Sequence, residues 1–271
     1  MKLHSFFAAV MGLLATTSGA AACGADSDCT LGDRHYRIAM PDGHDGATPV
    51  GAIVFAHGYR GSADGVMRNG SLRRMVSDKG LALIAVKSKA DDWVIPNAPR
   101  HMDSDGSEEF DYFDAVLDDA AQKFAIDPAR IMATGFSAGG MMVWNLACAR
   151  SDRFAAFAPI SGTFWMRPPD TCTGPIADVI HIHGDADKTV PLTGRKILET
   201  KQGEVFAALT MYRDYGGFSA PAAANHNNLR CEESSNPAGN LLNFCLFSGG
   251  HSFRTEYVSF AWDTFSQAGR L

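Results

Sequence analysis

The sequence lacks several features that would assign it to a class of protein at once. It contains no C-x-x-C pair, which argues against a structural zinc site. It has no basic run and a net charge of -6, so nothing in its composition favours binding to nucleic acid or to an anionic membrane surface. Internal repeats, low-complexity tracts and linkers are also absent. What remains is a chain of ordinary globular composition, 46% hydrophobic and 20% charged.

The first 22 residues have the features of a secretory signal peptide. Lys2 supplies a positive start, residues 5–17 carry no charge, and the three alanines at 20–22 form an A-x-A cleavage site. The apolar run is too short to span a bilayer. The alternatives are a buried N-terminal helix, or a lipid anchor at Cys23. We therefore expect a secreted or periplasmic protein with a single catalytic domain over residues 23–271 and no membrane span.

Cysteine usage agrees with export. All six cysteines lie beyond the expected cleavage site, and an even number in an exported chain indicates disulfides rather than free thiols. Many pairings are open to six cysteines. We predict the nearest-neighbour set, which is Cys23–Cys29, Cys148–Cys172 and Cys231–Cys245.

Short apolar runs alternate with amphipathic stretches along the chain. The expected strands are 50–56, 81–86, 130–135, 154–160, 179–183 and 241–247. Helices are expected after Ser107 and over 138–149 and 255–267. This alternation predicts an α/β fold with a mainly parallel, doubly wound sheet and helices on both faces. In such folds functional residues gather at the carboxyl ends of the strands.

The strongest functional motif is Gly135-Phe136-Ser137-Ala138-Gly139, a G-x-S-x-G between an expected strand and an expected helix. That context is the one in which this motif presents a nucleophilic serine on a sharp turn. A serine hydroxyl is a weak nucleophile at neutral pH, so it needs exposure and a neighbouring base. We predict Ser137 to be a catalytic nucleophile; a glycine-rich helix start is the alternative interpretation.

A second motif follows the strand at 179–183. Asp185 and Asp187 both lie where an α/β hydrolase places its carboxylate. We favour Asp187, because Thr-Val-Pro follows it in a loop expected to lead into the next helix, and we expect Asp185 to serve a turn. A rival interpretation is metal binding, since His181 and His183 share one face of the strand. A further histidine at position 186 would be needed for that motif, and alanine stands there.

A third motif supplies the base. His251 follows two glycines just after the last expected strand, and the order Ser137, Asp187, His251 is the chain order of α/β-hydrolase triads. The loop after residues 50–56 should supply one backbone N–H of an oxyanion hole, at Tyr59, and Ala138 should supply the other. We expect His57 to have a structural role.

Together these motifs resemble the secreted polyhydroxybutyrate depolymerase and feruloyl-esterase-like group of α/β hydrolases. The matching segments run from residue 23 to residue 253 and are Cys23-Gly24 with Cys29, His57-Gly58, Asp127-Pro128-Ala129-Arg130, the Ser137 motif through Met142, His183-Gly184 with Asp187 and Val190-Pro191, and Gly249-Gly250-His251. The resemblance implies ester hydrolysis through an acyl-enzyme, and it supports Asp187 as the acid. The family often has tryptophan where this chain has Phe253, and the match is loose over residues 191–231.

The sequence therefore predicts a serine esterase that acts on small or oligomeric esters, without cofactor or metal. Tyr59, Trp93, Phe136 and Trp165 are candidates for the walls of an acyl pocket, because aromatic side chains suit an aryl or alkyl acid. Two other hypotheses remain open. One is a secreted serine peptidase with the same triad, and the other is a binding protein on a catalytically silent hydrolase fold.

Export and disulfide formation are tested on the purified protein. Its N-terminus should lie near Cys23, and native protein under non-reducing conditions should take up no alkylating reagent. Intact-mass spectrometry measures both. Several alkylated cysteines in the native protein would contradict the three-disulfide prediction.

Overall fold

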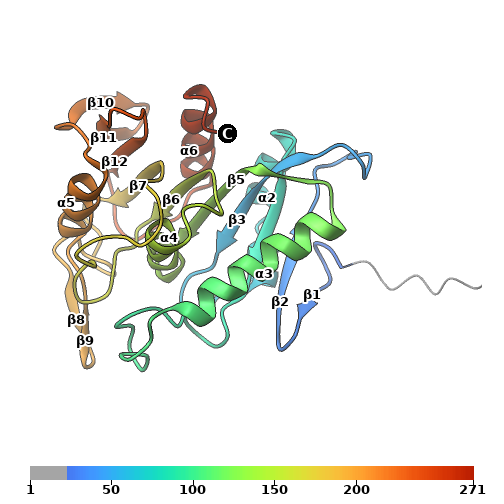
Figure 1. The fold of residues 1–271 in the computed structure, drawn as a ribbon, viewed down its shortest axis with the longest axis horizontal. Helices are drawn as coiled ribbons and strands as arrows, with labels where there is room; N and C mark the ends of the chain where they lie inside the picture. The colour runs from blue at the N-terminus through green and yellow to red at the C-terminus, as the bar shows by residue number, and fades with distance from the viewer. Residues whose placement is uncertain (1–22) are drawn as a thin grey trace, which may run out of the picture.

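The computed structural model describes residues 23–271, and the signal peptide predicted over 1–22 lies outside the described residues. A ten-stranded sheet with the order β1-β2-β4-β3-β5-β6-β7-β12-β11-β10 forms the centre of the fold (Figure 1). Its strands are β1 Cys29–Leu31, β2 Arg34–Ala39, β3 Val50–Ala56, β4 Ala82–Val86, β5 Ile126–Phe136, β6 Ala156–Ile160, β7 Val179–Gly184, β10 Ala222–His226, β11 Leu229–Ser235 and β12 Leu241–Phe247. A separate two-stranded hairpin consists of β8 Arg195–Ile197 and β9 Thr200–Gln202.

The central strands, from β4 through β3, β5, β6 and β7 to β12, pair in parallel. The outer strands β1, β2, β10 and β11 pair antiparallel. The parallel strands β4, β6 and β7 are buried along their whole length, as expected for strands covered on both faces. The predicted α/β-hydrolase fold is confirmed, with antiparallel edges added to the parallel centre.

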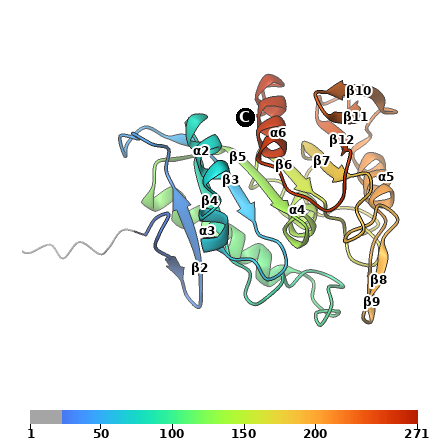
Figure 2. The same cartoon turned by 180° about the vertical axis from the view of Figure 1, so that it is seen from behind.

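Helices cover both faces of the sheet, as the two opposite views show (Figures 1 and 2). Residues of α3, α4 and α5 join one hydrophobic cluster, and residues of α1, α2 and α6 join the other. The helices are α1 Ala63–Met67, α2 Gly70–Asp78, α3 Ser107–Lys123, α4 Ala138–Ala149, α5 Val205–Gly216 and α6 Thr255–Gln267. α4 is buried from Ala138 to Cys148, which explains why its sequence is apolar on every side.

The segment after Asp187 differs from its prediction. We expected a loop leading into a helix, but the hairpin β8–β9 comes first, and α5 begins only at Val205. Gly194 and Leu198 take positive φ angles of 69° and 49°, which turn the chain into and around the hairpin. Each of the two strands has only three residues, too few to show the alternation by which a strand is recognised in a sequence.

All six cysteines are paired in the three predicted disulfides. Cys23–Cys29 closes the N-terminal segment onto β1, and Cys148–Cys172 joins the end of α4 to the segment that leads into β7. Cys231–Cys245 links residues that face each other across β11 and β12. None of the helices among residues 23–271 is long and apolar enough to cross a membrane.

Candidate active site

A pocket of about 610 Å³ contains the Ser137 motif at the carboxyl ends of the parallel strands. Its lining comes from the loops after β3, β6 and β7, the segment between β4 and α3, the turn before α4 and its start, and the β8–β9 hairpin. The lining residues are Tyr59, Ala90, Asp91, Asp92, Pro99, Arg100, His101, Ser137, Ala138, Met141, Trp165, Thr189, Arg195, Ile197, Leu198 and Gln202. A larger groove, about 1160 Å³, lies between α6 and the β10–β11 hairpin and contains none of the predicted triad. We place the candidate site by its chemistry, in the smaller pocket.

Ser137 occupies the sharp turn between β5 and α4. Its φ of 61° and ψ of −121° are unusual for a side chain with a Cβ atom, and such a conformation costs about 1–3 kcal/mol. The Ser137 N–H donates to the Ile160 carbonyl at 2.9 Å, which holds the turn against β6. A Cβ atom at position 139 would lie 1.9 Å from the Ala56 oxygen, so only glycine lets α4 begin this close to β3.

The two predicted oxyanion donors lie beside Ser137. Tyr59 and Ala138 both line the pocket, and neither backbone N–H has a hydrogen-bond acceptor among residues 23–271. The Ala138 N–H is free because it belongs to the first turn of α4, where no preceding helical carbonyl exists. Two unpaired N–H groups at one pocket are suited to stabilise a negative oxygen.

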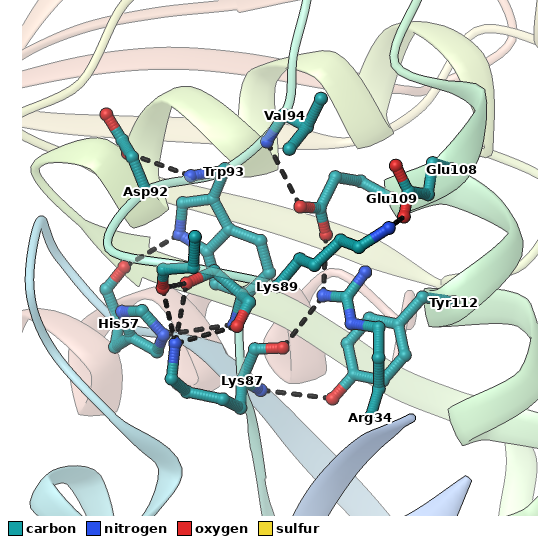
Figure 3. Close-up of polar contacts among 12 residues, drawn as sticks. Arg34, His57, Lys87, Lys89, Asp92, Trp93, Val94, Glu108, Glu109 and Tyr112 are labelled. Atoms are coloured by element: carbon teal, nitrogen blue, oxygen red, sulfur yellow. Dashed lines mark hydrogen bonds and ion pairs between the residues drawn. The ribbon is translucent and has the colours of Figure 1, made fainter. Parts of the chain in front are cut away.

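Buried polar contacts hold the loop after β3 in place at His57, two residues before Tyr59 (Figure 3). The Trp93 indole N–H donates to the His57 carbonyl at 2.9 Å, and the Ser88 N–H donates to His57 Nε2 at 3.1 Å. Further back, the fully buried Glu109 pairs with Arg34 at 2.8 Å and accepts the Val94 N–H. The segment between β4 and α3 is thereby fixed to the loop after β3. The expectation of a structural role for His57 agrees with these contacts.

Asp187 and His251 are in direct contact. His251 Nδ1 lies 2.7 Å from Asp187 Oδ2, while Oδ1 accepts the N–H groups of Thr189 and Val190, both at 2.8 Å. Burial acts to raise the pKa of Asp187, but the hydrogen bonds from His183, His251 and Val190 outweigh it and hold the pKa well below its usual range. The carboxylate is therefore ionised at neutral pH. It can orient the imidazole and stabilise its protonated form.

Asp185 joins the two loops that carry this pair. Its Oδ1 accepts the Gly249 N–H at 3.0 Å, and its Oδ2 accepts a hydrogen bond from Arg230 at 2.8 Å. The Ala186 N–H donates to the Gly249 carbonyl in return. Asp185 thus fixes the loop before His251 without touching the imidazole, in keeping with the turn role expected for it.

His251 is brought next to the serine turn through Phe136. The two ring centroids lie 4.5 Å apart, and Phe136 is the residue directly before Ser137. Phe253 packs against Phe136 and Phe55, with ring centroids 5.9 Å and 5.4 Å apart. The structure therefore gathers Ser137, Asp187 and His251 at one edge of the sheet.

Of the four aromatic candidates for the pocket walls, Tyr59 and Trp165 line the pocket and Trp93 does not. The prediction for Trp93 is wrong, since its side chain is fully buried between His57 and Phe113. Phe136 supports His251 rather than the pocket. Sequence reasoning missed Asp92, His101 and the hairpin residues, because no motif marks the segments that carry them.

The rival metal interpretation does not fit the contacts of its histidines. His181 and His183 are fully buried, and both ring nitrogens of each already have partners. One other cluster has ligand-like spacing, formed by His226, Cys231 and Glu233. Its cysteine belongs to a disulfide and so offers no thiolate.

Sequence comparisons match one segment of the chain to a peptidase family and longer segments to esterases. A profile of the prolyl oligopeptidase family matches residues 98–174, which include Ser137 but neither Asp187 nor His251. The chain is 27% identical to feruloyl esterase C of Emericella nidulans over 229 residues, 82% of this chain and 77% of that one. It is 33% identical to NocK of Nocardia uniformis subsp. tsuyamanensis, which is named as an esterase, over 59% of this chain and 47% of that relative. The match to NocK thus spans about half of that protein's length.

Solved structures agree on the fold. An acetyl xylan esterase from Aspergillus awamori superposes with a TM-score of 0.64 at 14% identity, covering 90% of this chain and 99% of the other. FphF, a fluorophosphonate-binding serine hydrolase of Staphylococcus aureus, gives 0.55 at 15% identity, covering 89% and 96%. At these identities the structures show the fold alone. The feruloyl esterase relatives confirm the feruloyl-esterase-like part of the predicted resemblance and support a carboxylic ester hydrolase.

The buried histidine behind the Tyr59 loop makes the fold sensitive to acid. Burial lowers the pKa of His57 to about 4, whereas the unfolded chain has a histidine pKa of about 6.5. The unfolded state therefore binds the extra proton first as the pH falls, and folding loses stability. We expect the free energy of unfolding to fall by about 2–3 kcal/mol between pH 6.5 and pH 4.5.

Urea unfolding followed across this pH range measures the loss. His57→Gln serves as the control, because a variant without this imidazole should show a smaller decrease. Equal pH slopes for the variant and the parent protein would contradict the assignment to His57. Burial also lowers the pKa of His181, so part of the decrease should persist in the variant.

Proposed function

We propose that this feruloyl-esterase-like α/β hydrolase is a serine carboxylic-ester hydrolase that works through an acyl-enzyme. The observation that carries the proposal is the 2.7 Å contact between His251 and the ionised Asp187, at the sheet edge where Ser137 sits in its turn. The relatives named as esterases support the same reaction class. Ester hydrolysis needs a nucleophile, a base and an oxyanion site, and one residue set offers all three.

In the proposed reaction, Ser137 Oγ attacks the ester carbonyl carbon and its proton passes to His251 Nε2. The carbonyl oxygen becomes negative and accepts hydrogen bonds from the Tyr59 and Ala138 N–H groups, each worth about 3 kcal/mol in acyl transfer. The intermediate collapses, and the alcohol leaves with the proton from His251. Water then attacks the acyl-enzyme and gives a proton to His251, which returns it to Ser137 Oγ as the acid is released. No cofactor enters these steps.

The shape and polarity of the pocket walls determine which acyl groups can bind. Tyr59, Trp165, Met141 and Leu198 offer flat or flexible apolar surface, whereas Asp92, Arg100, His101 and Arg195 offer polar groups in the same 610 Å³. Such a pocket suits a short aryl or hydroxyacyl group better than a long lipid chain. We propose feruloyl, short aryl and 3-hydroxybutyryl esters as substrates, the last as oligomers rather than crystalline polymer.

A peptidase is the second candidate, and the match to the prolyl oligopeptidase family over residues 98–174 favours it. The same triad serves amide hydrolysis. The matched segment contains the nucleophile turn, which both kinds of hydrolase share, so esters remain the preferred substrates. We also propose that the protein is exported, since its three disulfides would persist in an oxidising compartment.

A substrate panel tests the reaction class. We expect p-nitrophenyl esters of short acids and methyl ferulate to be cleaved, triglycerides of long acids to be poor substrates, and peptides to be poorer still. Ser137→Ala should abolish the activity, and EDTA should leave it unchanged. Faster cleavage of peptides than of short aryl esters would favour the peptidase, and EDTA inhibition reversed by zinc would revive the metal interpretation.

A pair of variants tests the acid. Asp187→Asn should lower kcat by about 10³-fold or more, because an amide cannot supply the charge that orients and stabilises the imidazole. Asp185→Asn is the matched control in the same loop, and we expect it to cost less than about tenfold. Both are measured on a p-nitrophenyl ester after circular dichroism has shown that each variant is folded. A larger loss for Asp185→Asn would mean that the wrong carboxylate is assigned.

A further inference from the structure

A chain of hydrogen bonds between aromatic side chains runs through the core to the Asp187 loop. The Trp144 indole N–H, on α4, lies 3.1 Å from His181 Nδ1, and His181 Nε2 lies 2.9 Å from His183 Nδ1. His183 Nε2 lies 2.8 Å from the Val190 carbonyl oxygen. The three side chains are fully buried, and neither histidine is needed for the proposed reaction.

The direction of every proton in this chain is fixed by its two ends. An indole N–H can only donate, so His181 Nδ1 must accept and its proton must lie on Nε2. His181 then donates to His183 Nδ1, which places the His183 proton on Nε2. The Val190 carbonyl can only accept, which agrees with that assignment. A second proton on either ring would bring two donors face to face, so both imidazoles stay neutral.

The chain ends where the Asp187 carboxylate is held. The Val190 N–H donates to Asp187 Oδ1 at 2.8 Å. Because His183 binds the carbonyl of the same residue, it fixes the backbone that holds the carboxylate. The same His183 Nε2 lies 3.5 Å from Asp187 Oδ2, the oxygen that accepts from His251. The His183 Nε2–H thus donates to the Val190 carbonyl and also faces the Asp187 carboxylate at a longer distance.

We propose that His183 is a positioning residue for the Asp187 carboxylate, with its N–H aimed by His181 and Trp144. The proposal rests on the esterase function given above. His183 touches neither the ester nor the reacting atoms; it acts by fixing which oxygen of Asp187 faces His251 and by offsetting part of the carboxylate charge. Neither effect requires His183 to change its protonation state.

Substitutions at His183 test the N–H directly. His183→Leu removes the donor at similar volume. We expect kcat to fall about 10- to 100-fold with KM within about twofold, because loss of the partner that orients a functional side chain costs about this much at metal sites. His183→Gln keeps an amide N–H that can donate to the Val190 carbonyl, and it should recover most of the loss in kcat.

The pH profile gives a second readout. In His183→Leu less of the Asp187 charge is offset, so Asp187 should hold the proton on His251 more firmly. The acid limb of kcat/KM should therefore move to higher pH in His183→Leu and not in His183→Gln.

A control separates positioning from stability. Phe157→Leu makes a cavity in the same sheet, at a fully buried residue that takes no part in these hydrogen bonds, and should lower Tm while kcat is unchanged. If His183→Leu keeps kcat within twofold of the parent, or if leucine and glutamine lower kcat equally with no shift of the acid limb, the proposal is wrong.

Nuclear magnetic resonance tests the proton directions without any substrate. The ¹⁵N shifts of His181 and His183 should report a proton on Nε2 in both rings. Trp144→Phe should leave both tautomers unchanged, because the Val190 carbonyl alone still requires His183 to donate from Nε2 and His181 to donate to His183. A proton on Nδ1 of either ring in the parent protein would overturn the inference. Absence of ester hydrolysis by the parent protein would instead overturn the proposed function, while leaving the tautomer result to stand.

Discussion

The close approach of α4 to the edge of the sheet is the constraint on which the candidate site depends. At position 139 a Cβ atom would lie 1.9 Å from the Ala56 oxygen, so the helix can start here only with glycine. Directly before this glycine, Ser137 has a φ of 61°, and the Ala138 N–H, in the first turn of α4, has no backbone acceptor among residues 23–271. The proposed nucleophile and one proposed oxyanion donor thus lie beside this packing contact, and the strain of the turn must be balanced by the rest of the fold.

That balance comes largely from buried polar groups on either side of the turn. On one side, Glu109, Arg34 and Trp93 hold the loop of His57 and Tyr59. On the other, the imidazoles of His181 and His183 reach the loop of Asp187. A buried polar network stabilises one arrangement when its members find partners, and the ring nitrogens of His181 and His183 all do. Arg34 is satisfied only in part, since its Nη2 pairs with Glu109 while Nε and Nη1 have no hydrogen-bond partner among residues 23–271. Both networks end on backbone carbonyls beside a proposed catalytic group.

The fold and the triad order were accessible from the sequence because each depends on local patterns. Apolar runs marked the central strands, and the glycines around Ser137 and His251 marked turns that only glycine allows. The pocket walls were not accessible. The sequence around Trp93 favours a loop residue near the site, yet the indole is buried and its N–H donates to the His57 carbonyl. The β8–β9 hairpin is too short to show a period, and its link to residues 97–100, through Thr200 and Glu199, joins segments about a hundred residues apart.

We propose that Ser137 is the nucleophile of a triad completed by the hydrogen-bonded pair of His251 and Asp187. The most direct measurement is treatment of the folded protein with a fluorophosphonate at neutral pH, followed by peptide mass spectrometry. The account predicts one adduct per chain, on the peptide that contains Ser137, formed at least a hundredfold more slowly in Asp187→Asn and absent from Ser137→Ala. Labelling of another residue, or an unlabelled Ser137 in protein shown to be folded, would contradict it.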